Sequence, residues 1–235
     1  YVSQFRYHDG YYDPIEKQFR GFARVEQIDL GDVSAPTLVT RSHFDTGARF
    51  EAMKGKLLRL TTETESGAVF AEQSTAWADP PVSLYAGTNG QTVQFALPVA
   101  TTNRIVELGI GTERLLETET AYDHFGNQIR QADYGIVANG DRSAFNDERI
   151  VTTEYALNTN AWLLRAPSRT ELKDEHGNVL SRTELFYDDE TFSGNNFGLV
   201  TIGNLTLKRE WISPSNSIAT IASARTKYDS YGNPT

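Results

Sequence analysis

The stretch Asp123-His124-Phe125-Gly126-Asn127 decides the fold, because its pattern of Asp, two variable residues, Gly and Asn returns twice further along the chain. It recurs as Asp174-Glu175-His176-Gly177-Asn178 and as Asp229-Ser230-Tyr231-Gly232-Asn233. An Asp side chain can accept hydrogen bonds from the backbone just downstream, and Gly and Asn tolerate a positive φ. Each copy therefore predicts a tight turn between two extended segments, and the repetition predicts that a β-hairpin is the building unit.

Extended segments fill most of the remaining chain. Apolar and polar residues alternate along them, with Thr, Val, Tyr and Phe enriched, which is typical of strands whose two faces meet different surroundings. The clearest are residues 57–65, 68–77, 92–97 and 149–157. Asn89-Gly90 predicts a short hairpin turn. Residues 199–211 predict a strand, a bend at Gly203-Asn204 and a second strand, while residues 48–54 favour a short helical turn.

Tyrosine precedes two of the repeated turns, giving Tyr122-Asp123 and Tyr228-Asp229. With the Gly-Asn that follows, these stretches resemble the YD repeat of Rhs-type bacterial proteins. The segments 5–13, 19–26 and 44–48 resemble the region of insecticidal toxin-complex B subunits that leads into their Rhs repeats. The three turns are more than two ordinary repeat lengths apart, so we expect the intervening copies to be degenerate or replaced by other hairpins. Asp188-Asp189 after Tyr187 is interpreted as one such modified turn.

The residues predicted to shape the repeat turns share turn-forming chemistry or the preceding tyrosine. They are Tyr122, Asp123, Gly126, Asn127, Asp174, Gly177, Asn178, Tyr228, Asp229, Gly232 and Asn233.

The resemblance implies an all-β fold in which consecutive antiparallel hairpins form a large curved sheet, part of a hollow shell. In this family the shell encloses a cytotoxic C-terminal polypeptide. The expected partners are neighbouring segments of the shell, the enclosed toxin polypeptide and other toxin-complex subunits, and the expected location is secreted or at the cell surface. Self-cleavage in this family uses a C-terminal repeat region that has no match here, so the resemblance implies no catalytic residue.

Domain organisation is predicted from the absence of any proline-rich linker. We expect one all-β segment over residues 1–235, with 1–115 leading into the repeats and 116–235 carrying degenerate YD-repeat hairpins. Because the chain starts without Met and stops just after a repeat turn, we expect it to be an internal piece of a longer protein.

Composition narrows the functional classes. The chain has no cysteine, so disulfides and thiolate metal sites are absent. Its net charge of −9 argues against nucleic-acid binding, which depends on clustered Lys and Arg. No apolar run approaches the roughly 20 residues that a membrane-spanning helix needs.

Candidate chemistry is sparse. The histidines are His8, His43, His124 and His176, which show no close metal-binding spacing, and zinc is the minority interpretation. Acidic clusters occur at Asp9, Asp13 and Glu16 and at Asp188-Asp189-Glu190. Turn formation is the favoured role for these carboxylates, with calcium binding or hydrolysis as alternatives. We therefore predict no enzyme activity and no cofactor.

Aromatic residues leave a second function open. Trp77, Trp162 and Trp211, with many Tyr and Phe, could pack successive hairpins together or form a carbohydrate- or cell-surface-binding β module. The binding module predicts two or three exposed aromatic side chains aligned on one face, whereas the shell predicts aromatic side chains buried between hairpins.

Overall fold

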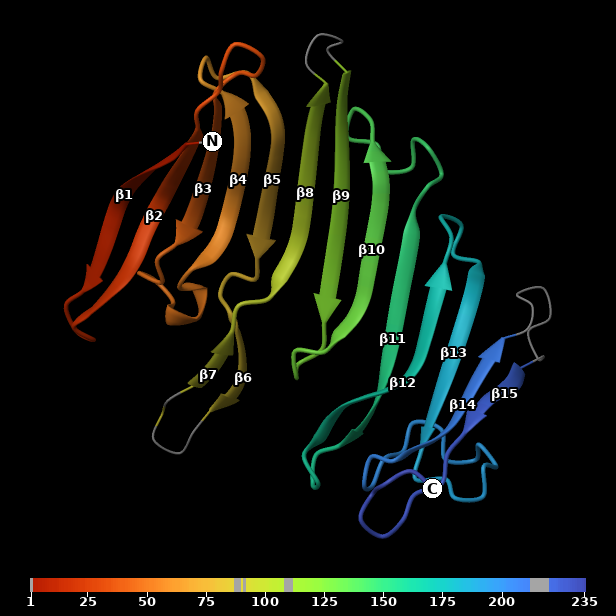
Figure 1. Ribbon diagram of the computed structural model, residues 1–235. Coiled ribbons are helices and arrows are strands. Elements are labelled where there is room, and N and C mark those ends of the chain that lie inside the picture. The colour runs from red at the N-terminus through yellow and green to blue at the C-terminus, as the bar shows by residue number, and fades with distance from the viewer. Residues whose placement is uncertain (1, 87–89, 91, 108–111, 212–219) are drawn as a thin grey trace. The chain divides into compact units, whose positions relative to one another are not determined.

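The computed structural model describes residues 2–86, 90, 92–107, 112–211 and 220–235 (Figure 1). Fifteen strands account for most of this part of the chain. The strands are β1 Ser3–Asp13, β2 Gln18–Asp29, β3 Leu38–Asp45, β4 Lys56–Thr64, β5 Val69–Trp77, β6 Val82–Ala86, β7 Thr92–Phe95, β8 Pro98–Glu107, β9 Thr112–Tyr122, β10 Gln128–Val137, β11 Arg149–Asn158, β12 Leu163–Lys173, β13 Val179–Tyr187, β14 Leu205–Trp211 and β15 Thr220–Arg225.

The strands pair in the order in which they occur in the chain. Thirteen of them form one antiparallel sheet that is not closed into a barrel, and β6 and β7 form a separate two-stranded hairpin. The predicted all-β fold of consecutive antiparallel hairpins is confirmed. Within the described residues the single helical element is the 3-10 turn Glu51–Met53, inside the predicted stretch 48–54. No helix among the described residues is long and apolar enough to span a membrane.

Contacts divide the chain into two compact units. Unit 1 comprises Tyr1–Thr120 and Tyr134–Phe145, and unit 2 comprises Ala121–Asp133 and Asn146–Thr235. The predicted organisation, with one segment and a change of character near residue 115, stays a prediction.

Unit 1 holds its strands together partly through charged side chains on neighbouring strands. Glu26 on β2 lies directly opposite Arg41 on β3, and the Arg41 Nε lies 3.1 Å from the Glu26 carboxylate. Arg41 also pairs with Glu63 on β4. Both glutamate residues are only 8% exposed. A buried carboxylate needs a charged or hydrogen-bonding partner. Arg41 is that partner for a glutamate on each of the two strands that flank β3.

Unit 2 contains a small apolar core. Ala156 on β11, Tyr187 at the end of β13 and Val200 form its centre, and Leu163, Ala166, Leu185 and Leu205 pack around them. Phe186 and Leu207 on the paired strands β13 and β14 are also fully buried. The core therefore draws on strands and on the long connection that contains Val200.

Two strand predictions need correction. Residues 199–202 do not form a strand: the Leu199 N–H donates to the Asn196 carbonyl, and the N–H groups of Thr201 and Ile202 donate to Asp188. Strand β7 ends at Phe95, short of the predicted residue 97. For the predicted Asn89-Gly90 turn, Asn89 lies outside the described residues, and Gly90 has a φ of +78° between β6 and β7.

Candidate functional site

The first repeat turn is held by its own aspartate. Asp123 Oδ1 accepts hydrogen bonds from the backbone N–H of Phe125 at 2.9 Å and of Asn127 at 2.8 Å. The Asp123 N–H donates to the Asn127 carbonyl at 2.9 Å, which closes the turn. Gly126 has a φ of +78°, a conformation that glycine adopts without steric cost. The buried Asn127 side chain also donates to the Leu164 carbonyl, so the turn is tied to β12.

The other two copies repeat this arrangement. Asp174 Oδ1 accepts from the N–H groups two and four residues downstream at 3.0 and 2.7 Å. Asp229 Oδ1 does so at 2.9 Å in both cases. Hydrogen bonds from the side chains of Asn178 and Asn233 lower the pKa values of Asp174 and Asp229 below the ordinary value. These aspartates therefore stay ionised, which strengthens the hydrogen bonds that they accept.

A fourth turn of the same kind is assembled from two distant pieces of the chain. The Asp188 N–H donates to the Asn204 carbonyl at 2.8 Å, and the Asn204 N–H donates to Asp188 Oδ1 at 2.9 Å. Asp188 follows Tyr187, as Asp123 follows Tyr122, and Gly203 has a positive φ of +104°. Tyr187-Asp188 and Gly203-Asn204 are thus the two halves of one repeat turn. Residues 189–202 stand where the other copies have two residues.

Sequence reasoning identified both halves of this turn but did not join them. Asp188-Asp189 was interpreted as a modified turn and Gly203-Asn204 as the bend of a separate hairpin. The shared signal was the order Tyr-Asp followed by Gly-Asn, which becomes visible only when the intervening residues are treated as an insertion.

The insertion is packed onto the sheet. Asp188 Oδ2 accepts hydrogen bonds from the backbone N–H groups of Thr201 and Ile202 at 2.8 and 2.9 Å. Burial would raise the pKa of Asp188, but these N–H groups, with those of Gly203 and Asn204, lower it overall. The insertion's first residue, Asp189, is buried and accepts a hydrogen bond from the Gly194 N–H at 2.6 Å.

Tyrosines preceding the turn aspartates fix neighbouring segments. The Tyr187 hydroxyl donates to the Pro167 carbonyl at 3.0 Å, and the Tyr228 hydroxyl donates to the Leu205 carbonyl at 2.9 Å. Leu205 directly follows the Gly203-Asn204 half of the fourth turn. Each of these tyrosines therefore carries one hydrogen bond from its own turn to a different strand.

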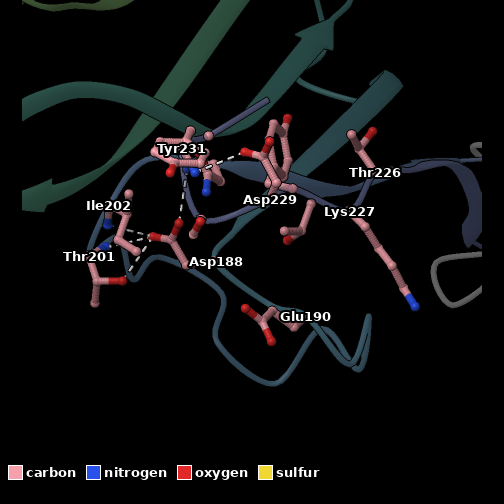
Figure 2. A pocket seen from close by; sticks show the side chains of 13 residues that line it. Asp188, Glu190, Thr201, Ile202, Thr226, Lys227, Asp229 and Tyr231 are labelled. Atoms are coloured by element: carbon pink, nitrogen blue, oxygen red, sulfur yellow. Dashed lines mark hydrogen bonds between the residues drawn. The ribbon is translucent and has the colours of Figure 1, made fainter. Parts of the chain in front are cut away.

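A pocket of about 820 Å³ lies between the fourth turn and the last one (Figure 2). Residues of the insertion form part of its lining, including Glu190, Thr201 and Ile202. The rest of the lining is formed by Asp188, Asn204, Thr206 and the segment 226–232. All of these residues belong to unit 2.

The histidines have separate surroundings. His8 Nε2 lies 3.5 Å from Glu26, and His124 stacks on Phe125 with ring centroids 3.7 Å apart. His43 on β3 lies opposite Arg24 on β2.

Among the described residues, one group could offer three ligand atoms to a metal ion, namely Asp174, Glu175 and His176, within 4.8 Å of one another. The Asp174 carboxylate already accepts the hydrogen bonds of its turn. Asp174 and Glu175 are half-buried and His176 is exposed, and a group of this kind does not by itself define a metal site.

The predicted acidic cluster near the N-terminus forms a turn. Asp13 Oδ1 accepts hydrogen bonds from the backbone N–H groups of Ile15 and Glu16, and Asp13 Oδ2 lies 2.8 Å from Arg20 Nη2. Asp9 adopts a positive φ of +54° on β1.

The three tryptophans differ in exposure. The Trp77 indole N–H donates to the Leu57 carbonyl at 3.0 Å, and the Arg182 guanidinium lies 3.9 Å from the centroid of the Trp211 ring. Trp162, in the turn between β11 and β12, is 69% exposed. Two of the three are therefore packed within the fold.

Consecutive antiparallel hairpins, with Asp-capped Gly-Asn turns in unit 2, define the chain as an all-β hairpin structure. Residues 1–47 match the protein family described as the insecticide toxin TcdB middle/N-terminal region. With the structural similarities that follow, this match confirms the predicted resemblance to toxin-complex B subunits. No protein of curated function matches the chain in sequence.

Solved toxin structures share the fold. The chain is similar to a crystal structure of TcdB2-TccC3 with a TM-score of 0.65 and 14% identity, and to one of TcdB2-TccC3-Cdc42 with the same values. A Tc holotoxin pore of Photorhabdus luminescens is similar with a TM-score of 0.62 and 14% identity. Each similarity covers 89% of this chain and 15% of the other. The chain thus spans a small part of the length of the structures it matches.

Proposed function

We propose that the chain is a wall segment of a bacterial Rhs- or toxin-complex-type shell that encloses a cytotoxic C-terminal polypeptide, and that it performs no chemistry of its own. The observation that carries this proposal is the sheet order. Between its two edge strands, each strand of the large sheet pairs with the sheet strand that comes before it in the chain and with the one that comes after it. A sheet built in this way grows by adding hairpins, as repeat proteins do, and so suits a wall.

The repeat turns have a structural role in this proposal. Asp123, Asp174, Asp188 and Asp229 each close a connection through hydrogen bonds to nearby or returning backbone. The oxygens of these carboxylates already accept hydrogen bonds from the backbone, which supports a role in shaping the wall. We further propose that residues 1–115 lead into the repeats and that 116–235 are the repeats themselves.

The proposed partners follow from the same family. They are neighbouring segments of the shell, the enclosed polypeptide and other toxin-complex subunits, in a toxin that is secreted or presented at the cell surface. The match of residues 1–47 and the shared fold support a role in a toxin complex.

A protease-protection experiment on the full-length parent protein tests the proposal. A protease site is placed within the C-terminal polypeptide, and cleavage is followed in the intact protein and in the polypeptide expressed alone. The proposal expects the site to resist cleavage in the intact protein and to be cut rapidly in the isolated polypeptide. Equal cleavage rates would overturn the enclosing role.

A further inference from the structure

The pocket in unit 2 exists because the fourth repeat turn carries an insertion. Glu190, Thr201 and Ile202 line one part of the pocket, and all three lie within the insertion 189–202. The next repeat turn, around Asp229, lines the opposing part. A repeat turn with two variable residues lacks the segment that supplies the first part. The insertion therefore converts the space beside an ordinary turn into a pocket.

Several polar groups that line the pocket are already occupied by hydrogen bonds within the fold. Asp188 accepts hydrogen bonds from the backbone N–H groups of the insertion's end, and Asp229 accepts them from its own turn, as the dashed lines in Figure 2 show in part. The Tyr228 hydroxyl donates to Leu205. These groups fix the shape of the pocket but have little hydrogen-bonding capacity left for a ligand.

A second set of side chains remains available. Within the part of the chain that the structure describes, the side chains of Glu190, Thr226, Lys227, Ser230 and Tyr231 make no hydrogen bond or ion pair. They come from both parts of the lining, and Figure 2 shows the side chains of Thr226 and Lys227 apart from that of Tyr231. Tyr231 is 89% exposed, so its ring presents a free face. The available groups are three hydroxyls, one carboxylate and one ammonium.

This inventory discriminates between classes of ligand. An anion would face the ionised carboxylates of Asp188 and Asp229 with a single cation, Lys227, to offset them. A metal cation would find only the Glu190 carboxylate free, because the carboxylates of Asp188 and Asp229 already accept backbone N–H groups. An apolar molecule would bury polar hydroxyls without partners. A neutral ligand rich in hydroxyls can donate to Glu190 and accept from Ser230.

We propose that this pocket binds a neutral carbohydrate, with a sugar ring stacked against Tyr231 and its hydroxyls bonded to Glu190 and Ser230. A tyrosine ring can cover an apolar face while its hydroxyl stays wet, which suits the C–H face of a sugar. The volume of about 820 Å³ lies within the range of small-molecule pockets. The proposal is independent of the shell role, because a wall segment can also carry a surface binding site.

Saturation-transfer NMR on the 235-residue chain tests the carbohydrate site. The probes are glucose, galactose, mannose and N-acetylglucosamine, each titrated to about 20 mM, since an open pocket of this kind is expected to bind in the millimolar range. At least one sugar is expected to receive saturation. Glu190→Gln and Tyr231→Ala are each expected to weaken its binding roughly tenfold, a loss of about 1.4 kcal/mol.

Trp162→Ala provides the matched control. Trp162 is also an exposed aromatic residue of unit 2, but it does not line the pocket, so its loss is expected to leave sugar binding unchanged. Melting curves establish that all three variants are folded. The proposal is overturned if none of the four sugars binds. It is also overturned if the Glu190→Gln and Tyr231→Ala variants bind sugar as tightly as the unmodified chain does. Binding of inorganic phosphate or calcium in place of the sugars also overturns it.

Discussion

The backbone N–H of Asp188 donates to the carbonyl of Asn204 at 2.8 Å, although the two residues are sixteen positions apart. Asp123 and Asn127 close the same hydrogen-bonded ring at a separation of four. The geometry of a repeat turn thus survives an insertion between its two halves. The Asp188 carboxylate makes this possible, because it binds the returning backbone of residues 201–204 directly.

Asp188→Ala tests this role of the carboxylate. Removing it leaves several backbone N–H groups of residues 201–204 without their acceptor, so we expect the free energy of unfolding to fall by about 1–3 kcal/mol. Urea unfolding at neutral pH measures the loss. Asp229→Ala is the comparison, because the Asp229 turn is exposed and holds only local backbone. Equal losses in the two variants would contradict a special role for Asp188 in closing the insertion.

The acid stability of the protein follows from the turn aspartates. Burial would raise the pKa of Asp188, but backbone N–H groups lower it below the ordinary value of 3.8. A carboxyl group whose folded pKa is lowered stabilises the fold fully above its unfolded pKa. That contribution is lost as the pH falls through the lower, folded pKa. We therefore expect the melting temperature to fall as the pH drops below 3.8, and to fall less in Asp188→Asn than in the parent.

Tyr187→Phe tests the hydrogen bond between a turn tyrosine and a neighbouring strand. Tyr187 is 7% exposed, and its hydroxyl donates to the Pro167 carbonyl at 3.0 Å. Its removal leaves that carbonyl without this donor, so we expect a loss of about 1 kcal/mol in urea unfolding. Tyr231→Phe is the matched control, because the Tyr231 hydroxyl is exposed. A loss of the same size in Tyr231→Phe would show that the Pro167 contact is unimportant.

Arg41→Met tests the charged network of unit 1. The variant leaves the carboxylates of Glu26 and Glu63 buried without their shared arginine, and we expect a loss of about 3 kcal/mol at neutral pH. Burial raises the pKa of Glu26 and Arg41 helps to lower it, so the loss of Arg41 leaves that pKa higher and mild acid should restore part of the lost stability relative to the parent. Unfolding by urea at pH 7 and pH 5 measures both effects.

Arg49→Met controls for the loss of an arginine charge, because the Arg49–Asp79 pair is exposed to solvent. We expect little change in its free energy of unfolding at either pH. If Arg41→Met were as stable as Arg49→Met, the buried network would not contribute to the stability of unit 1.

Local chemistry explains what could be predicted from the sequence. The turns at Asp123, Asp174 and Asp229 depend on hydrogen bonds that reach at most four residues along the chain. Apolar and polar residues alternate along strands such as β4 and β5 because successive side chains point to opposite faces of a strand. The charged network of unit 1 was not predicted, because it depends on strand register: Glu26 meets Arg41 only when β2 and β3 pair as they do.

The sequence by itself determined the hairpin unit, because Asp, Gly and Asn set the backbone of each short turn without help from distant residues. It also determined the all-β class through the period of its strands. Only the tertiary structure decided that Tyr187-Asp188 and Gly203-Asn204 form one turn, since the pairing of β13 with β14 brings the two halves together. The pocket followed from the same step, because its opposing parts come from an insertion and a turn that are separate in sequence.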